Sequence, residues 1–103
     1  MPLNIGSIAN VIVSGEVSGS ATAKQLPDIT GGLVWIQALF TNAGNVYVGA
    51  AGVTIPDGTT DTTSGVALDA GDWLGPLSLA NLNKLYIICD NAGDDITYFI
   101  EQA

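Results

Sequence analysis

Several side chains on which enzyme chemistry often depends are absent from this sequence or occur only once or twice. There is no histidine and no arginine, and the two cations are Lys24 and Lys84. Without histidine, neither a Ser-His-Asp nor a Cys-His nucleophile can form, and without arginine no guanidinium can clamp a phosphate or carboxylate. The lone Cys89 lies in an apolar run, where a buried small hydrophobe is expected rather than a reactive thiol. The sequence therefore predicts that the protein is not an enzyme.

The acidic side chains leave two kinds of chemistry open, a carboxylate pair and a calcium site. Glycoside hydrolysis needs one carboxyl of raised pKa inside a cleft, whereas most aspartates here lie in predicted turns that solvent would reach. Calcium takes its oxygen ligands from such loops. The groups that would supply it at one end of a sandwich are Asp69 with Asp72, and Asp90 with Asp94 and Asp95. We expect neither a metal nor any other cofactor.

The low charge content predicts a surface that contacts other proteins. Charged residues make up 12% of the chain, about half the usual share of a soluble domain. The stretch from Ile29 to Pro56 carries no charge, yet glycines and asparagines interrupt it too often for a membrane span. Contiguous uncharged surface marks contact with another protein. A neutral surface of Thr, Ser and Gly is the alternative.

The net charge of −8 argues against two further partners. Nucleic-acid binding needs several cationic side chains to neutralise the backbone, and an anionic membrane surface repels an acidic protein. We therefore expect no nucleic acid and no membrane among the partners. The N-terminus, residues 1–4, lacks the basic start and apolar core of a signal peptide, and one cysteine forms no internal disulfide. Both features favour assembly in a reducing cytoplasm.

The chain has the pattern of an all-β domain, because apolar residues recur at spacing two or in short runs between Gly and Asn/Asp clusters. About eight strands and no helix are expected. The strands are Ile8–Ser14, Ala21–Leu26, Leu33–Thr41, Asn45–Ala50, Val66–Leu68, Trp73–Leu77, Lys84–Cys89 and Asp95–Glu101. This number in one domain predicts a single-domain two-sheet β-sandwich, with an eight-stranded jelly roll as the leading arrangement.

The turns between these strands have their own signals. The segments 41–45 and 90–94 each contain Asn-Ala-Gly, which is typical of a hairpin loop with a left-handed glycine. The turn at 69–72 has similar chemistry, and the polar segment 57–65 predicts an exposed, mobile loop. The first two segments resemble each other weakly, which suggests equivalent hairpins in two halves of the domain.

Two parts of the chain are predicted to contact other subunits or a larger assembly. Residues 1–7 form an N-terminal arm before the domain at 8–103, and Leu3 and Ile5 of this arm are expected to dock on a neighbour, since they precede the core strands. The segment 33–40 is apolar on both faces, although a sandwich strand buries only one. Trp35, Gln37 and Leu39 are therefore candidate contacts, and we expect a homo-oligomer, with a trimer as the leading form.

Turn and strand motifs between residues 39 and 99 resemble those of the decoration, or cement, proteins of tailed-bacteriophage capsids. The motifs are Gly-Asn-Val-Tyr-Val-Gly at 44–49, Gly-Val at 52–53, Leu-Asp-Ala-Gly-Asp at 68–72 and Leu-Asn-Lys-Leu-Tyr-Ile at 82–87. The resemblance implies a compact β-sandwich, often trimeric, that binds the major capsid protein on the outside of the shell and reinforces it. It implies a place on the capsid surface of the virion, after assembly in the host cytoplasm, and no catalytic residues.

A carbohydrate- or receptor-binding module of a phage fibre or tail is the alternative function. Fibre and tail proteins share the same motifs, and aromatic side chains can stack on sugar rings. The aromatic residues available for such a platform are Trp35, Tyr47, Trp73, Tyr86 and Tyr98. Core or subunit contact is the leading interpretation of these side chains.

Overall fold

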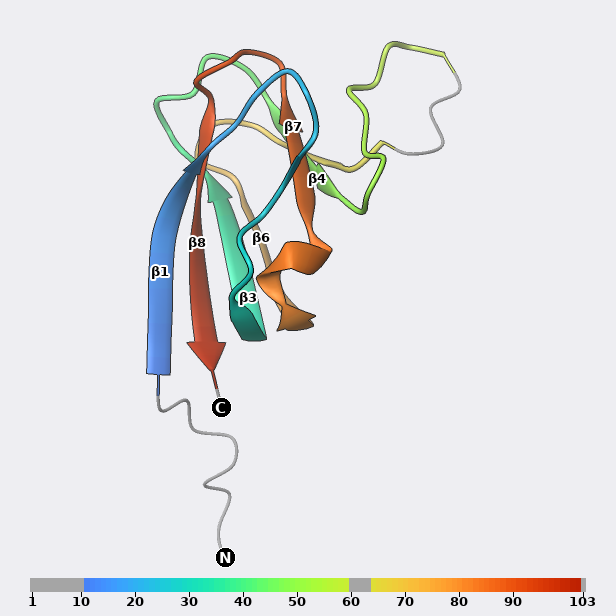
Figure 1. Cartoon of the computed structure of the whole chain (residues 1–103). Helices are drawn as coiled ribbons and strands as arrows, with labels where there is room; N and C mark the ends of the chain where they lie inside the picture. The colour runs from blue at the N-terminus through green and yellow to red at the C-terminus, as the bar shows by residue number, and fades with distance from the viewer. Residues whose placement is uncertain (1–10, 60–63, 103) are drawn as a thin grey trace, which may run out of the picture.

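The computed structural model describes residues 11–59 and 64–102, which form two four-stranded antiparallel sheets packed face to face (Figure 1). The first sheet, sheet A, consists of β1 (Val11–Ser18), β3 (Thr30–Ala38), β6 (Trp73–Asn81) and β8 (Asp95–Gln102). The second, sheet B, consists of β2 (Lys24–Gln25), β4 (Val46–Gly49), β5 (Val66–Leu68) and β7 (Tyr86–Cys89). A 3-10 turn, η2 (Leu82–Lys84), links β6 to β7. The all-β sandwich expected from the sequence is confirmed.

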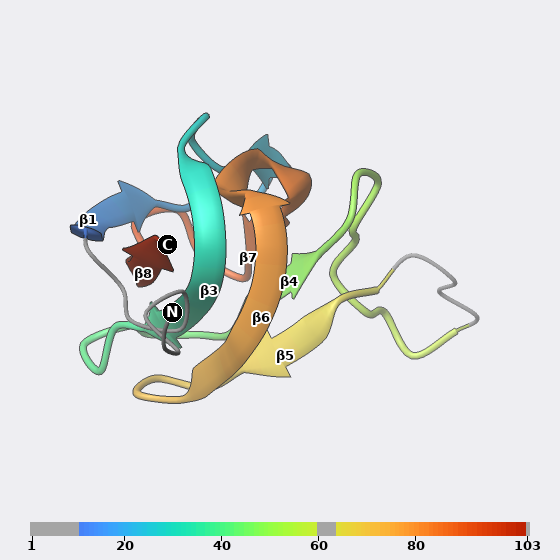
Figure 2. The same cartoon turned by 90° about the horizontal axis from the view of Figure 1, so that it is seen from below.

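The strand order identifies the sandwich as a jelly roll. Sheet A has the order β1-β8-β3-β6, and sheet B has the order β2-β7-β4-β5. Consecutive strands therefore change sheets at every connection except the one from β4 to β5. Figure 2, which looks along the strands, shows the two layers and the crossings between them. This interleaving is the double-sheet arrangement of eight-stranded jelly rolls.

The expected hairpins at 41–45 and 90–94 are wrong, because each segment crosses from one sheet to the other. The first joins β3 of sheet A to β4 of sheet B, and the second joins β7 back to β8; the turn at 69–72 also changes sheets. Gly93 has the expected left-handed backbone, at φ +92°, whereas Gly44 is not among the glycines with positive φ. Turn chemistry predicts where the chain reverses, but it does not determine which sheet receives the next strand.

Several strand limits also differ from the expectation. β6 runs four residues beyond Leu77, and it contains Pro76, which an edge strand tolerates because one side of its backbone has no strand neighbour. Lys84 lies in η2 and not in a strand, because the Asn81 side chain accepts a hydrogen bond from the backbone N–H of Asn83 at 2.9 Å and starts a turn. β2 is shorter than expected and β1 extends beyond Ser14. Ile8, the expected start of β1, lies outside the described residues, as does the 1–7 arm with Leu3 and Ile5.

The core lies between the sheets and follows the alternation of each strand. On β3, the side chains of Val34, Ile36 and Ala38 are fully buried, and on β8 Ile96 and Ile100 join them. Successive residues of a strand point to opposite faces, so this inward set places Leu33, Trp35 and Gln37 on the outer face of sheet A. Complete burial of each large aliphatic side chain contributes about 1.5–3 kcal/mol to folding. The core thus fixes which side chains sheet A presents outward.

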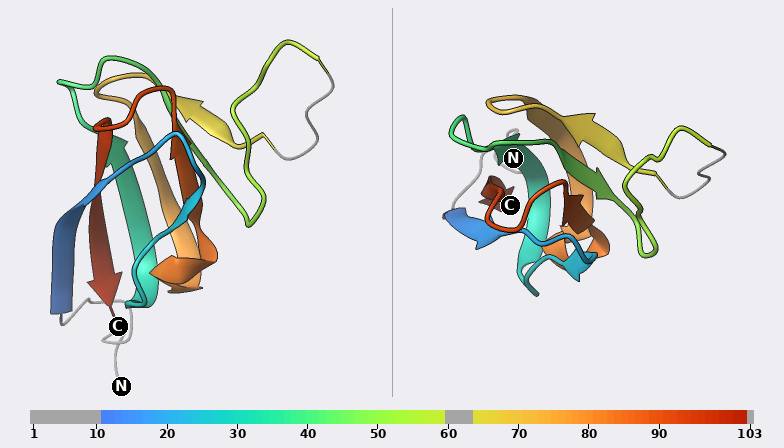
Figure 3. Two further views of the ribbon diagram at one scale, coloured as in Figure 1. Left: turned by 45° about the horizontal axis from the view of Figure 1, so that its top comes forward. Right: turned by 90° about the horizontal axis from the view of Figure 1, so that it is seen from above.

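The outer face of sheet B is covered by the chain itself. Tyr47 of β4 and Ile88 of β7 form a second buried cluster with Val53, which lies in the connection between β4 and β5. Ile55 of the same connection and Tyr86 pack against this cluster. Figure 3 shows the described part of this connection, in yellow-green, leaving β4 and extending beyond the sandwich. No described segment covers the outer face of sheet A in the same way.

Candidate functional site

The outer face of sheet A carries large apolar side chains that the described chain leaves accessible. Leu33 is 42% exposed, Trp73 58% and Phe99 39%, and Ile12 on the edge strand β1 is 51% exposed. The strand register brings them together, because Trp35 lies opposite Phe99 and Gln37 opposite Trp73. Residues opposite each other in antiparallel strands share a face. We call this surface the outer apolar face, and its members are Ile12, Leu33, Trp35, Trp73 and Phe99.

Three aromatic rings of the outer apolar face border a shallow, open hollow. Its volume is about 310 Å³, and Trp35, Trp73, Phe99 and Glu101 line it. The rings of Trp35 and Phe99 meet edge to face, with centroids 5.8 Å apart and planes at 70°. This geometry is favourable for an aromatic pair and presents both a ring face and a ring edge. The hollow is therefore an apolar depression with one carboxylate on its wall.

Polar side chains near this hollow are few. Gln37 donates from Nε2 to the backbone oxygen of Gly71 at 3.4 Å, so its amide is partly occupied. Glu101 lies between two apolar residues across the sheet, opposite Ile12 on β1 and Leu33 on β3. Within residues 11–59 and 64–102, the Glu101 carboxylate has no hydrogen bond and no ion pair. Its charge is thus uncompensated by the part of the chain that the structure describes.

The structure places the candidate contacts unequally. Trp35 and Gln37 lie on the outer face of sheet A, as the two-sided apolar pattern of their strand predicted. Leu39 follows the end of β3, where it is half-buried and its N–H donates to the backbone oxygen of Asp95 at 3.1 Å. Phe99 was not identified from the sequence; it points outward because it alternates with Ile100, which is buried in the core. The roles of these residues in subunit or shell contact stay predictions.

The aromatic residues considered for a sugar platform separate into three environments. Trp35 and Trp73 line the same hollow. Tyr47 and Tyr86 belong to the second cluster on sheet B, and Tyr98 packs against the main core. Only the two tryptophans of that set thus meet at one accessible surface.

The aspartates considered for calcium are used instead to join loops. The Asp94 side chain is 3% exposed, and its carboxylate accepts hydrogen bonds from the backbone N–H groups of Ala43 and Gly44 at 2.9 and 3.2 Å. The Asp90 carboxylate accepts from the Asn45 backbone at 2.9 Å and from the Tyr47 hydroxyl at 3.1 Å. In residues 11–59 and 64–102, no three His, Cys, Asp or Glu side chains are grouped to hold a metal ion.

The two Asn-Ala-Gly crossovers therefore bind one another at one end of the sandwich. The Asn42 side-chain amide forms two hydrogen bonds with the backbone of Asp95. Its Nδ2 donates to the Asp95 oxygen at 2.8 Å, and its Oδ1 accepts from the Asp95 N–H at 2.9 Å. The backbone oxygen of Asp94 also accepts from Gly19 at 2.8 Å, which adds the end of β1 to the group. The weak sequence likeness of the two segments thus corresponds to adjacent loops, although they are not hairpins.

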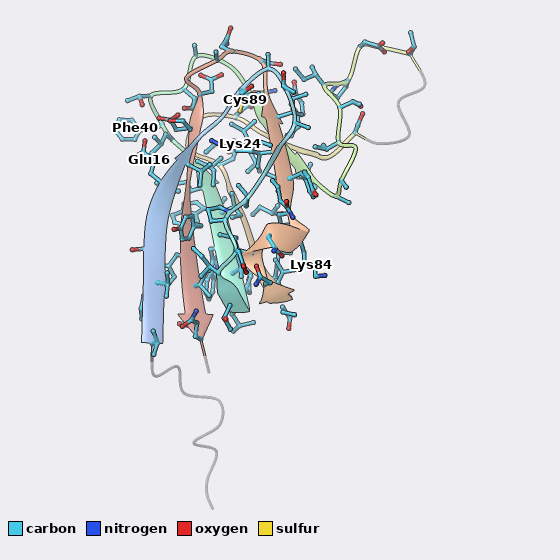
Figure 4. The ribbon with its side chains drawn as sticks, viewed as in Figure 1. Glu16, Lys24, Phe40, Lys84 and Cys89 are labelled. Atoms are coloured by element: carbon cyan, nitrogen blue, oxygen red, sulfur yellow. The ribbon has the colours of Figure 1, made fainter. Side chains whose placement is uncertain are left out.

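Cys89 lies beside this junction and is fully buried. Its Sγ is 3.6 Å from the backbone oxygen of Asp94, and burial raises the pKa of the thiol above its ordinary value. The thiol therefore stays protonated at neutral pH and packs as a small apolar group. Figure 4 shows Cys89 near this end of the molecule, together with the exposed Glu16 and Phe40.

Glu16 provides a prediction about pH. Its pKa is raised, first by a hydrogen bond with the Asp95 side chain and further by the negative charge of that residue. An acid whose pKa is higher in the folded protein stabilises the fold when protonated, and this stability is lost as pH rises through the folded pKa. Glu16→Gln should therefore raise Tm at pH 8 and have little effect near pH 4. Thermal melts followed by circular dichroism check this, and an equal shift at both pH values would contradict it.

Comparison with known proteins yields no relative. No protein-family model, curated protein or solved structure matches the chain. Among the residues that the structure describes, no helix is long and apolar enough to cross a membrane. The functional argument accordingly starts from the outer apolar face.

Proposed function

We propose that this chain is a structural virion protein, a decoration protein that binds the outside of a phage capsid shell and stabilises it. In this proposal it acts as a homotrimer, and its second partner is the major capsid protein. The observation that carries the proposal is the outer apolar face, with four side chains between 39% and 58% exposed on one sheet of a small domain. Exposed apolar patches on soluble domains are typical of protein contact sites.

The contrast between the two sheets supports assembly as the role of this face. On sheet B, Val53 and Ile55 cover the aromatic side chains that point outward. On sheet A, Trp73 and Phe99 have no such cover in the described part of the chain. An apolar surface of this kind gains free energy when another protein excludes water from it, at about 25 cal/mol per Å². Association with a protein surface is the simplest use of sheet A.

The charge distribution is compatible with a protein present in many copies. With 12% charged residues, the chain offers neutral surface for contacts with subunits and shell. Its net charge of −8 keeps free copies soluble and repels them from packaged nucleic acid. The arm residues Leu3 and Ile5, which lie outside the described part, are the second proposed attachment point.

Binding to purified shells tests the proposed function. We expect the protein to co-sediment with undecorated capsids until a fixed number of copies per shell is reached, and to raise the temperature at which the shells break. The same protein mixed with capsids that already carry a decoration protein is the control, because occupied sites should bind none. Absence of saturable binding to the shells of the phage that encodes the chain would refute the proposal.

A carbohydrate-binding module remains the second candidate function, because Trp35 and Trp73 line one accessible hollow. Indole rings can stack on sugar rings, and Glu101 would accept a hydroxyl hydrogen. A glycan array probed with the free protein separates the two functions. Strong binding to one glycan class, without binding to shells, would favour the module.

A further inference from the structure

The hollow on sheet A has the composition of a site for a cationic side chain. Trp35, Trp73 and Phe99 provide its aromatic walls, and Glu101 adds a negative charge. An ammonium group near the face of an aromatic ring is attracted by the negative potential of the ring, most strongly for tryptophan. The apolar walls also suit the methylene stem of a lysine, which packs on apolar surface while its charged end reaches a polar partner.

A neutral sugar fits the same hollow less well. Glu101 is the one polar residue among the four that line it. A sugar ring brings several hydroxyl groups, and each one left without a hydrogen-bond partner costs free energy on binding. A lysine side chain brings a single polar group, which one carboxylate can satisfy.

The chain itself supplies the cation that complements this hollow. Of its two lysines, Lys24 donates from Nζ to the backbone oxygen of Ser18 at 3.1 Å. Lys84 is exposed at the end of η2, and among the described residues its ammonium forms neither a hydrogen bond nor an ion pair. Figure 4 shows the Lys84 side chain directed away from the sheets. Lys84 and Glu101 thus each lack a charged partner in the part of the chain that the structure describes.

Lys84 and Glu101 do not pair within the described part of one subunit, so a pair between them would join two copies. Within the described residues the two side chains form no ion pair, and Lys84 follows the end of β6 whereas Glu101 lies on the outer face of β8. A contact that joins two different surfaces of the same subunit is head to tail, and it closes into a ring when the rotation between subunits allows. The same pair could also form twice across a two-fold dimer, so the trimer is taken from the proposed function. In it, each Lys84 would meet the Glu101 of the next copy.

We propose that Lys84 of one copy enters the hollow formed by Trp35, Trp73 and Phe99 of the next copy and pairs there with Glu101. This rests on the proposed function, because it names what covers the outer apolar face in the homotrimer. The pair also offsets part of the repulsion between subunits that each carry a net charge of −8, because it brings opposite charges into contact across the interface. Three equivalent pairs would give the ring its register and direction.

A charge exchange tests the pairing. Lys84→Glu and Glu101→Lys should each weaken the trimer about tenfold or more, as measured by sedimentation velocity over a dilution series. The double variant, with both charges exchanged, should restore the trimer to near its original strength. Lys24→Glu is the matched control, since it changes the net charge as Lys84→Glu does, and it should leave the trimer more stable than Lys84→Glu. Circular dichroism verifies that every variant is folded.

The outcomes distinguish this inference from the proposed function. The Lys84–Glu101 pair would be overturned if the trimer tolerates both single exchanges. It would also be overturned if the double variant does not restore the trimer that the single exchanges weaken. Either outcome leaves the decoration role intact. A wild-type chain that is monomeric throughout would overturn both the pair and the homotrimer, while shell co-sedimentation would still decide the decoration role. Binding of a neutral oligosaccharide that Trp73→Ala abolishes, with no effect of Lys84→Glu on assembly, would assign the hollow to glycans instead.

Discussion

Replacing Asp94 with alanine should lower the free energy of unfolding by about 3 kcal/mol. A loss of this size is typical when one partner of a buried hydrogen bond to a charged group is removed. The carboxylate is 3% exposed and accepts from the backbone nitrogens of Ala43 and Gly44. Alanine leaves both part-buried N–H groups without the buried carboxylate that accepts from them. Urea unfolding followed by tryptophan fluorescence measures the loss.

Asp72→Ala is the control for this prediction. Asp72 is also an aspartate in a crossover, and its carboxylate accepts from the backbone N–H of Asp69 at 3.0 Å, but the residue is exposed. Water can take the place of this acceptor, so the cost should stay at about 1 kcal/mol or less. If the two variants lose the same stability, burial of Asp94 does not matter and the crossovers hold together by other contacts.

The Asp94 junction also shows which part of the fold sequence patterns can predict. The alternation of β3 separates Val34, Ile36 and Ala38 from Trp35 and Gln37 in the sequence alone, because a period of two is a local property of a strand. Both sets are largely apolar, so only the packing decides which of them is buried. That Asn42 would bind the backbone of Asp95 depends on which strands become neighbours, and this is decided by packing across the whole domain. The two Asn-Ala-Gly segments therefore indicated turns correctly but could not indicate that both cross between sheets.

The candidate site also has one part that the sequence predicts and one part that only the structure reveals. Trp35 and Gln37 were predicted as contact residues, since their strand has more apolar residues than one buried face can hold. The hollow needed more, because Trp73 and Phe99 reach Trp35 only through the register of β6 and β8 against β3. Likewise, nothing local to Val53 indicated that it would cover sheet B. Long-range pairing thus creates the difference between a covered sheet and an accessible one, and the functional argument depends on that difference.

Changing both Leu33 and Trp73 to serine should convert the proposed trimer into a monomer while the fold remains. Both side chains belong to the outer apolar face and are 42% and 58% exposed, so in the single subunit their truncation should cost about 1 kcal/mol or less each. In an assembly that buries them, each contributes up to about 1.5–3 kcal/mol, and losing both should weaken association at least 100-fold, roughly. Light scattering coupled to gel filtration measures the mass, and thermal melts measure the fold.

Val66→Ser is the control that gives this experiment its meaning. Val66 is 51% exposed, as accessible as the outer apolar face, but it lies on β5 at the edge of sheet B. If general hydrophobicity drives association, Val66→Ser should weaken the trimer as well as the Leu33/Trp73 double variant does. Each variant should then lose association strength in proportion to the apolar area that it removes. If the outer apolar face is the interface, Val66→Ser should leave the mass unchanged and only the Leu33/Trp73 variant should dissociate. A double variant that stays trimeric would place the interface elsewhere, and the hollow of Trp35, Trp73 and Phe99 would then lie open in the assembled protein.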